Sequence, residues 1–306
     1  MEKRFTGTVV RATGSWYEVR HDGETVRCRM RGRLRLQGRR STNPVVVGDE
    51  VACEADDGGD YVIADIAPRR NYVIRRASNL SKESHIIAAN VDRALLVVTL
   101  RAPETATEFV DRFLVTCEAY KVPAAILLSK IDLQDPEAVA AFRAVYEGAG
   151  YRVLEAAAPQ GVGVEEVREL LAGCTTLVAG NSGVGKSTLV RAIDPSLDIR
   201  TGEISESHRK GRHTTTFSAM YPLAGGGAVI DTPGIMGFGL LDIDGAELWH
   251  YFPEMMRTAP GCRFYNCTHT HEPGCAVVEA VRRGEIAPAR YESYLKILDE
   301  DEKYRK

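Results

Sequence analysis

A glycine-rich stretch in the middle of the chain has the residue types and spacing of a loop that binds phosphate groups. It consists of Gly180, Asn181, Ser182, Gly183, Val184, Gly185, Lys186, Ser187 and Thr188. The glycines allow a tight turn whose successive backbone N–H groups point toward phosphate oxygens. Lys186 can neutralise the terminal phosphates, and the Ser187 hydroxyl can bind Mg²⁺. These residues predict a nucleoside triphosphate site that uses Mg²⁺.

The segments around this loop alternate between apolar strands and helices. We expect strands over 94–99, 124–128, 151–154, 175–179 and 228–230, and helices over 110–120, 136–147, 164–171 and 188–193. Asp135 followed by Pro136 is a typical helix start. This alternation predicts a doubly wound parallel sheet, which binds its ligand at the carboxyl ends of the strands.

A second motif follows the strand at 124–128 and bears on the base of the nucleotide. Its residues are Ser129, Lys130, Ile131 and Asp132, which resemble the Asn-Lys-x-Asp motif of GTPases. A carboxylate there accepts hydrogen bonds from the N1–H and 2-amino groups of guanine. Adenine has neither donor, and an unpaired carboxylate would penalise its binding. The motif predicts GTP rather than ATP.

Two polar segments are candidates for sensing the third phosphate. Asp231 and Gly234 fit an Asp-x-x-Gly pattern after a strand, and a polar loop spans 211–216. One threonine of that loop, with Thr215 as our candidate, is expected to complete the Mg²⁺ shell. Ile235 stands where many GTPases carry a glutamine that orients water, so isolated turnover should be slow. We expect Lys186 to be catalytic, and His213 is our candidate for orienting the attacking water.

The first 70 residues form a different kind of unit. Short alternating runs at 5–10, 16–20, 25–36, 45–52 and 61–66 predict five strands of a small barrel of the oligonucleotide-binding type. One run places arginines on a single strand face, namely Arg27, Arg29, Arg31, Arg33 and Arg35. Such a face suits a nucleic acid backbone, although an ordinary solvated strand face is the alternative.

A cysteine-rich segment near the carboxyl end predicts a metal site. Its candidate ligands for one structural Zn²⁺ are Cys262, Cys267, His269 and Cys275, with His271 as a competing ligand. Helices are expected around it at 247–256, 277–283 and 291–304. Such a small module should depend on the metal to fold.

Composition limits the class of protein. The 306 residues are 44% apolar and carry a net charge of −3, while residues 1–70 hold 13 Lys and Arg against 11 Asp and Glu. The chain shows neither a signal peptide nor an apolar run long enough for a membrane span, so we expect a cytoplasmic protein without a membrane partner. Seven cysteines favour reduced thiols and metal binding over disulfides.

The order of the motifs is unusual, because the guanine motif precedes the phosphate loop by about fifty residues. This order indicates a circularly permuted GTPase. A basic barrel, a permuted GTPase and a Cys-Cys-His-Cys module together resemble the bacterial family called ribosome small subunit-dependent GTPase A. The resemblance divides the chain into a barrel at 1–70, a GTPase domain at 71–245 and a helical zinc module at 246–306.

The resemblance also implies an activity and partners. It implies hydrolysis of GTP to GDP and phosphate, stimulated by the small (30S) ribosomal subunit during late subunit maturation. The barrel and zinc module would contact ribosomal RNA, and the protein would act as a monomer. The sequence departs from the family's pattern at two places that bear on guanine binding. Ser129 replaces the usual Asn or Thr, and Ala156, Ala157 and Ala158 lie where a Ser-Ala pair often contacts guanine.

Two other functions remain open from the sequence. An ATP-using phosphotransferase could be built on the same phosphate loop, although Asp132 argues against it. An RNA-binding scaffold could hold the nucleotide only as a structural ligand, although Lys186, Ser187 and Asp231 argue against that. Nucleotide competition separates the first from a GTPase, and turnover with ribosomes separates the second.

Overall fold

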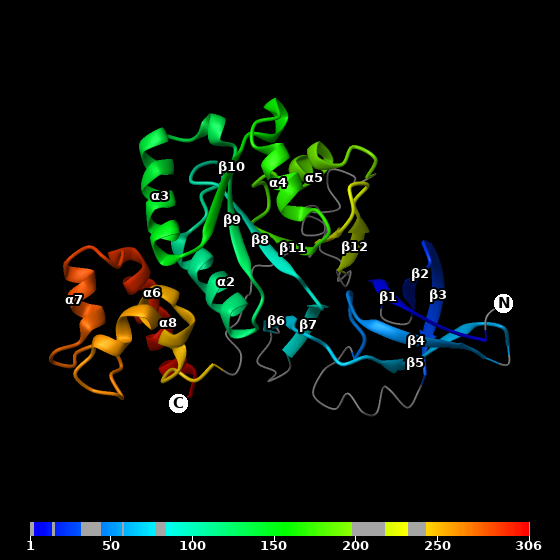
Figure 1. Cartoon of the computed structure of the whole chain (residues 1–306), viewed down its shortest axis with the longest axis horizontal. Helices are drawn as coiled ribbons and strands as arrows, with labels where there is room; N and C mark the ends of the chain where they lie inside the picture. The colour runs from blue at the N-terminus through cyan, green and yellow to red at the C-terminus, as the bar shows by residue number, and fades with distance from the viewer. Residues whose placement is uncertain are drawn as a thin grey trace.

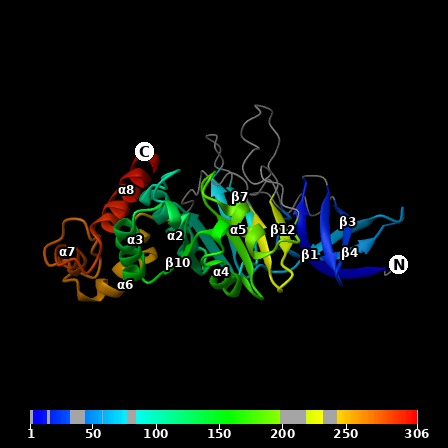
Figure 2. The ribbon, with the colours of Figure 1, turned by 90° about the horizontal axis from the view of Figure 1, so that it is seen from above.

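The computed structural model describes residues 3–13, 16–31, 44–56, 58–76, 84–197, 218–231 and 243–305. A parallel sheet flanked by helices lies in the middle, with a small barrel on one side and a C-terminal helical module on the other (Figure 1). In the turned view the same three parts follow one another along the long axis (Figure 2). Within these ranges no helix is both long enough and apolar enough to cross a bilayer.

Five parallel strands form the middle of the molecule. Their order across the sheet is β10-β9-β8-β11-β13, with bounds β8 Arg93–Val98, β9 Ala124–Ser129, β10 Arg152–Ala156, β11 Thr175–Ala179 and β13 Ala228–Asp231. Continuous apolar runs suit strands that are buried on both faces. The predicted doubly wound parallel sheet is thereby confirmed.

Helices cover both faces of this sheet. They are α2 Thr107–Ala119, α3 Pro136–Ala149, α4 Val164–Leu171 and α5 Lys186–Ile193. Leu96 and Val98 of β8 pack with side chains of α2 and α3. Leu95 and Val97 pack with α4 and α5. Because neighbouring strand residues point to opposite faces, one apolar strand serves two cores.

The predicted start of α3 is also observed. The Asp135 side chain accepts a hydrogen bond from the Glu137 backbone N–H at 2.9 Å, and Pro136 is the first helical residue. The cap satisfies an N–H group that has no partner within the helix.

The barrel is a closed ring of five strands, as predicted. The strands are β1 Arg4–Ala12, β2 Tyr17–His21, β3 Glu24–Met30, β4 Glu50–Ala55 and β5 Tyr61–Ile66. They pair in the order β1-β2-β3-β5-β4, and β4 returns to pair with β1. The strand pair β3–β5 is parallel and the others are antiparallel. Closure leaves no unpaired sheet edge within the ring.

Two barrel strands differ from the expectation. The strand expected over 25–36 ends at Met30, and residues 32–43 lie outside the described part of the chain. We expected a strand over 45–52, but pairing begins only at Glu50, and Val45, Val46 and Val47 form a buried loop. A side chain closes that loop, because the fully buried Asp49 accepts a hydrogen bond from the Val46 N–H at 2.8 Å. An apolar run of this length cannot by itself distinguish a buried strand from a buried loop.

Three further strands were not expected. Strand β6, Tyr72–Arg76, pairs with β7, Ser84–Ala89. Strand β12, Ala219–Pro222, pairs with β13 and also reaches the barrel. Ala219 lies opposite Asp231 of β13 on one side and opposite Arg11 of β1 on the other. The barrel and the parallel sheet are therefore one continuous hydrogen-bonded sheet of 11 strands.

The C-terminal module, residues 243–305, is built from four short helices and one of 18 residues. They are η4 Leu248–Tyr251, α6 Pro253–Thr258, η5 Ala259–Gly261, α7 Ala276–Arg282 and α8 Pro288–Arg305. The prediction of a single helix over 247–256 is wrong, because the helical conformation is interrupted between η4 and α6. Pro253 explains the break, because proline disfavours a helical conformation in the residue before it.

A buried arginine attaches this module to the parallel sheet's helices. Arg290 of α8 is 1% exposed and donates to Asp111 of α2 at 2.6 Å and to Glu254 of α6 at 2.7 Å. Its guanidinium carbon also lies 4.7 Å from the centre of the Phe252 ring. Val115 of α2 belongs to the module's apolar core. The module is therefore packed directly on α2 through both charged and apolar contacts.

Replacing Arg290 by alanine is expected to destabilise the module strongly. Two carboxylates, Asp111 and Glu254, would stay buried without their cation, at a cost of about 3–5 kcal/mol. Trp249 lies in the module, so its fluorescence in a Trp16→Phe background reports urea unfolding there. Arg282→Ala is the control, since its exposed ion pair with Glu279 should contribute less than about 0.5 kcal/mol to the free energy of unfolding. If Arg290→Ala lowered the free energy of unfolding by less than about 1 kcal/mol, Arg290 would not hold the module in place.

Candidate nucleotide site and metal cluster

The phosphate loop follows β11, the strand between β8 and β13, and leads into α5. Gly180 has φ +142°, and a Cβ there would lie 2.2 Å from the Val97 carbonyl oxygen. Gly183 and Gly185 also have positive φ angles, of 85° and 102°. Side chains are strained in this conformation, so glycine is required at the turn. The loop therefore has the backbone expected of a phosphate cradle.

Lys186 and Asp231 lie together beneath this loop. Both side chains are 7% exposed, and Lys186 Nζ donates to the carbonyl oxygens of Gly180 at 2.7 Å and Asn181 at 2.9 Å. Burial lowers the pKa of Lys186, while the carboxylate of Asp231 acts in the opposite direction. This pair of opposite charges stands where the phosphate loop and the end of β13 meet.

The guanine motif lies beside the phosphate loop, as its place at a strand end predicted. Ser129 is the buried last residue of β9, and its Oγ lies 3.1 Å from the position that a Cβ on Gly185 would occupy. Lys130 takes the left-handed conformation with φ +56° and donates to the Ala102 carbonyl oxygen at 2.9 Å. Ile131 and Asp132 then begin a short 3-10 helix, η1 Ile131–Leu133.

One contact in this region was not expected from the sequence. Gln160 ends the 3-10 helix η2, Ala158–Gln160, and its Nε2 donates to Asp132 Oδ2 at 3.1 Å. The three alanines at 156–158 place no polar side-chain group in this loop. Nothing in the sequence marks Gln160 except its position shortly after them.

Several predicted site residues lie outside the described part of the chain. They are His213, Thr215 and Gly234 of the two candidate phosphate sensors, and Arg33 and Arg35 of the arginine run. Their roles stay predictions.

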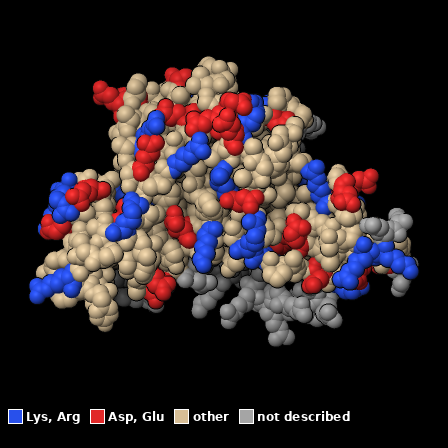
Figure 3. Space-filling model, viewed as in Figure 1, with Lys and Arg blue, Asp and Glu red and all other residues tan. Residues whose placement is uncertain are grey.

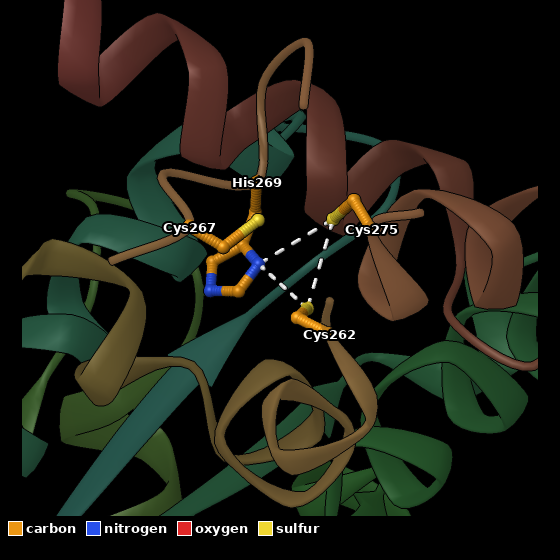
Figure 4. A group of neighbouring side chains, drawn as sticks. All are labelled: Cys262, Cys267, His269 and Cys275. Atoms are coloured by element: carbon orange, nitrogen blue, oxygen red, sulfur yellow. Dashed lines mark hydrogen bonds between the residues drawn. The ribbon is translucent and has the colours of Figure 1, made fainter. Parts of the chain in front are cut away.

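The four predicted metal ligands come together in the C-terminal module (Figure 4). The ligand atoms of Cys262, Cys267, His269 and Cys275 all lie within 4.8 Å of one another. His269 Nδ1 is 3.6 Å from the Cys262 sulfur and 3.5 Å from the Cys275 sulfur, and these two sulfurs are 3.9 Å apart. Zinc bonds of about 2.0–2.3 Å in a tetrahedron put ligand atoms about 3.5–3.8 Å apart. The cluster is therefore compatible with Zn²⁺.

The surroundings of the cluster suit metal binding. Tyr291 and Tyr294 of α8 donate to the carbonyl oxygens of His269 and Thr268 at 2.7 and 2.6 Å, which fixes the ligand loop. Burial lowers the pKa of His269, which favours the neutral imidazole that binds metals. Burial also raises the pKa of the Cys267 thiol to about 12. A cation is needed to favour its thiolate, so metal affinity should fall as the pH falls.

The barrel exposes part of the predicted arginine face. Arg27, Arg29 and Arg31 are exposed on β3 and just beyond it, while Cys28 between them is buried. The Trp16 ring lies 4.0 Å from the Arg27 guanidinium carbon and 4.2 Å from that of Arg29. On the face shown in Figure 3, Lys and Arg gather at the outer end of the barrel.

Acidic side chains offset some of this charge. Asp60 lies 3.4 Å from Arg29, and Glu54 lies 3.2 Å from Arg31. These acids come from neighbouring parts of the barrel, so the run of arginines in the sequence overstates the local positive charge. Trp16, the first residue of the strand expected over 16–20, was not predicted to lie beside the arginines.

Comparison with known families decides the assignment. Residues 66–241 match the profile described as RsgA GTPase, and residues 6–63 match the RsgA N-terminal domain. The chain belongs to the RsgA family of GTPases. It is 50% identical over 305 residues to the small ribosomal subunit biogenesis GTPase RsgA of Bacteroides fragilis, covering 98% of both chains. The RsgA of Porphyromonas gingivalis with the same description is 54% identical over 310 residues, again covering 98% of both.

Two solved structures agree with the fold. The structure of YjeQ from Thermotoga maritima has a TM-score of 0.76 and 36% identity, covering 97% of this chain and 98% of its own. The structure of YloQ, described as a circularly permuted GTPase, has a TM-score of 0.73 and 30% identity, covering 99% and 96%. The prediction of a permuted GTPase with a barrel in front of it is confirmed, and the chain is a GTP-hydrolysing enzyme.

Proposed function

We propose that this GTPase acts in biogenesis of the small ribosomal subunit and hydrolyses GTP to GDP and phosphate when it binds that subunit. The observation that carries the proposal is the junction of two loops: Ser129 lies against Gly185, so the guanine motif and the phosphate loop are adjacent, as one nucleotide site requires. The relatives from Bacteroides fragilis and Porphyromonas gingivalis are both named for small ribosomal subunit biogenesis.

The site residues divide between base and phosphates. Asp132 would accept hydrogen bonds from guanine, and the backbone N–H groups of 180–188 would bind the phosphates. Mg²⁺, held by Ser187 and Asp231, would neutralise charge on the outer phosphates. Lys186, which donates to the Gly180 and Asn181 carbonyls here, would donate to phosphate oxygens in their place. Its positive charge would stabilise the negative charge that spreads over the transferred group.

Both flanking parts would contact ribosomal RNA. On the barrel, Trp16 offers an aromatic face, and Arg27, Arg29 and Arg31 offer positive charge. Tyr265 in the ligand loop of the C-terminal module is fully exposed, and Phe264 beside it is 40% exposed. Aromatic rings next to arginine are suited to stacking on unpaired bases.

The Cys262, Cys267, His269 and Cys275 cluster would hold one structural Zn²⁺. Four protein ligands leave no open position for catalysis. We further propose a monomeric, cytoplasmic protein with units at 1–70, 71–245 and 246–306; the family matches at 6–63 and 66–241 support the first two units.

Replacing Lys186 by alanine is expected to reduce hydrolysis at least 100-fold, because it removes the positive charge proposed to bind the outer phosphates. The measurement is phosphate release from GTP and from ATP, each with and without purified small ribosomal subunits. The intact protein should be slow, selective for GTP, and strongly stimulated by subunits. Lys296→Ala, an exposed lysine on α8, is the control and should keep full activity.

Two results of that assay would overturn the proposal. Hydrolysis that favours ATP would support a phosphotransferase instead. Undetectable turnover of the intact protein with subunits present would support a scaffold that holds nucleotide as a structural ligand.

The purified protein is expected to contain one zinc ion per chain. Cobalt substituted for it should give the absorption bands of a tetrahedral thiolate site, and a strong chelator should lower the melting temperature. Cys262→Ser should lose the metal, whereas Cys174→Ser, which lies outside the cluster, should retain it. A zinc content near zero in freshly purified protein would contradict this assignment.

Trp16→Ala is expected to weaken binding to small subunits about 3- to 10-fold at a fixed salt concentration, because the aromatic surface for stacking is lost. Arg27→Ala should also weaken binding and should make it less dependent on salt. Arg152→Ala is the matched control, since Arg152 is exposed on β10 and pairs with Glu166. Unchanged affinity for both barrel variants would show that this face does not contact the subunit.

A further inference from the structure

The loop after β10 contributes a side chain to the proposed base site that none of the sequence motifs includes. Gln160 Nε2 donates to Asp132 Oδ2 at 3.1 Å. The two loops meet because β10 and β9 are parallel neighbours and Ala156 lies directly opposite Ser129. Both strands therefore end at the same edge, and the residues that follow them come into contact.

The backbone of the Gln160 loop is held in one conformation. Ala157 and Val162 exchange two backbone hydrogen bonds of 3.1 and 3.2 Å, and the Gln160 N–H donates to the Ala157 carbonyl at 3.0 Å. Gly163 packs so closely that a Cβ on it would lie 1.9 Å from the Glu155 carbonyl oxygen. The position from which the glutamine reaches Asp132 is therefore fixed by the fold.

The backbone of the Asp132 loop is fixed as well. The Leu133 N–H donates to the Lys130 carbonyl at 2.9 Å, and the buried Gln134 side chain donates to the same oxygen at 3.1 Å. The Asp132 side chain itself is exposed. Its remaining freedom is rotation of the carboxylate, and the Gln160 amide is a donor placed to restrict that rotation.

Guanine recognition depends on that orientation. The N1–H and the 2-amino group are two parallel donors, and both carboxylate oxygens must face them at once. A carboxylate has about four acceptor positions, so Oδ2 can accept from Gln160 and from the base together. Ala157 and Ala158 have no side-chain donor for this task.

We propose that Gln160 is a positioning residue for guanine specificity, holding the Asp132 carboxylate so that both its oxygens face the base. This inference rests on the proposed role of Asp132 in binding guanine. It predicts that loss of Gln160 weakens the second hydrogen bond to the base more than the first. Inosine nucleotides lack the 2-amino group and make only the first, so they distinguish the two effects.

The test measures the affinity of the full-length protein for fluorescent analogues of GDP and of inosine diphosphate, with Mg²⁺ present. Gln160→Ala should weaken GDP binding about 5- to 20-fold and inosine diphosphate binding at most about twofold. Gln160→Glu, which keeps the size but replaces the donor by an acceptor, should weaken GDP binding at least as much. Val162→Ala, an exposed change in the same loop, should leave both affinities unchanged.

The outcomes separate this inference from the function on which it rests. Equal weakening of both nucleotides would indicate a merely structural role and would overturn the proposal, as would unchanged or tighter GDP binding. If the unaltered protein binds both diphosphates equally, or if Asp132→Asn leaves GDP affinity unchanged, then Asp132 itself does not read guanine. In that case the proposed base site is wrong, and the role of Gln160 falls with it.

Discussion

The parallel alignment of five strands is the constraint on which the rest of this structure depends. Parallel strands place all their carboxyl ends at one edge of a sheet. The phosphate loop after β11, the Ser129 motif after β9, Gln160 after β10 and Asp231 at the end of β13 therefore meet at that edge. Their order along the chain has no influence on this meeting. A permuted sequence can consequently build the same site as an unpermuted one.

Burial of the strands gives that edge its rigidity. Side chains of β8 alternate between a core shared with α2 and α3 and a core shared with α4 and α5. The close approach of Gly180 to the Val97 carbonyl ties the phosphate loop to the neighbouring strand. Lys186 and Asp231 are consequently held in a poorly solvated place, where opposite charges interact more strongly than in water.

The two flanking parts are attached by different interactions. The barrel joins through the backbone, since Asp231, Ala219 and Arg11 lie in one row across three neighbouring strands. Two strand spacings, about 10 Å, thus separate the backbone of a proposed Mg²⁺ ligand from the barrel. The C-terminal module joins through side chains, chiefly Arg290 with Asp111 and Glu254, at the opposite side of the sheet (Figure 1). The proposed zinc cluster lies within that module and not at the nucleotide site.

The sequence alone determined the features that consecutive residues encode. A phosphate loop, a helix start at Asp135 and a closely spaced set of cysteines each depend on local backbone geometry or on ligand chemistry, so each was predictable. Contacts between distant segments carried no such signal. Arg290 and Asp111 are 179 positions apart, and Gln160 meets Asp132 only because two strands lie side by side. Tertiary structure decided these contacts, because which polar groups share a buried or crowded place depends on how the elements pack and not on their spacing in the chain.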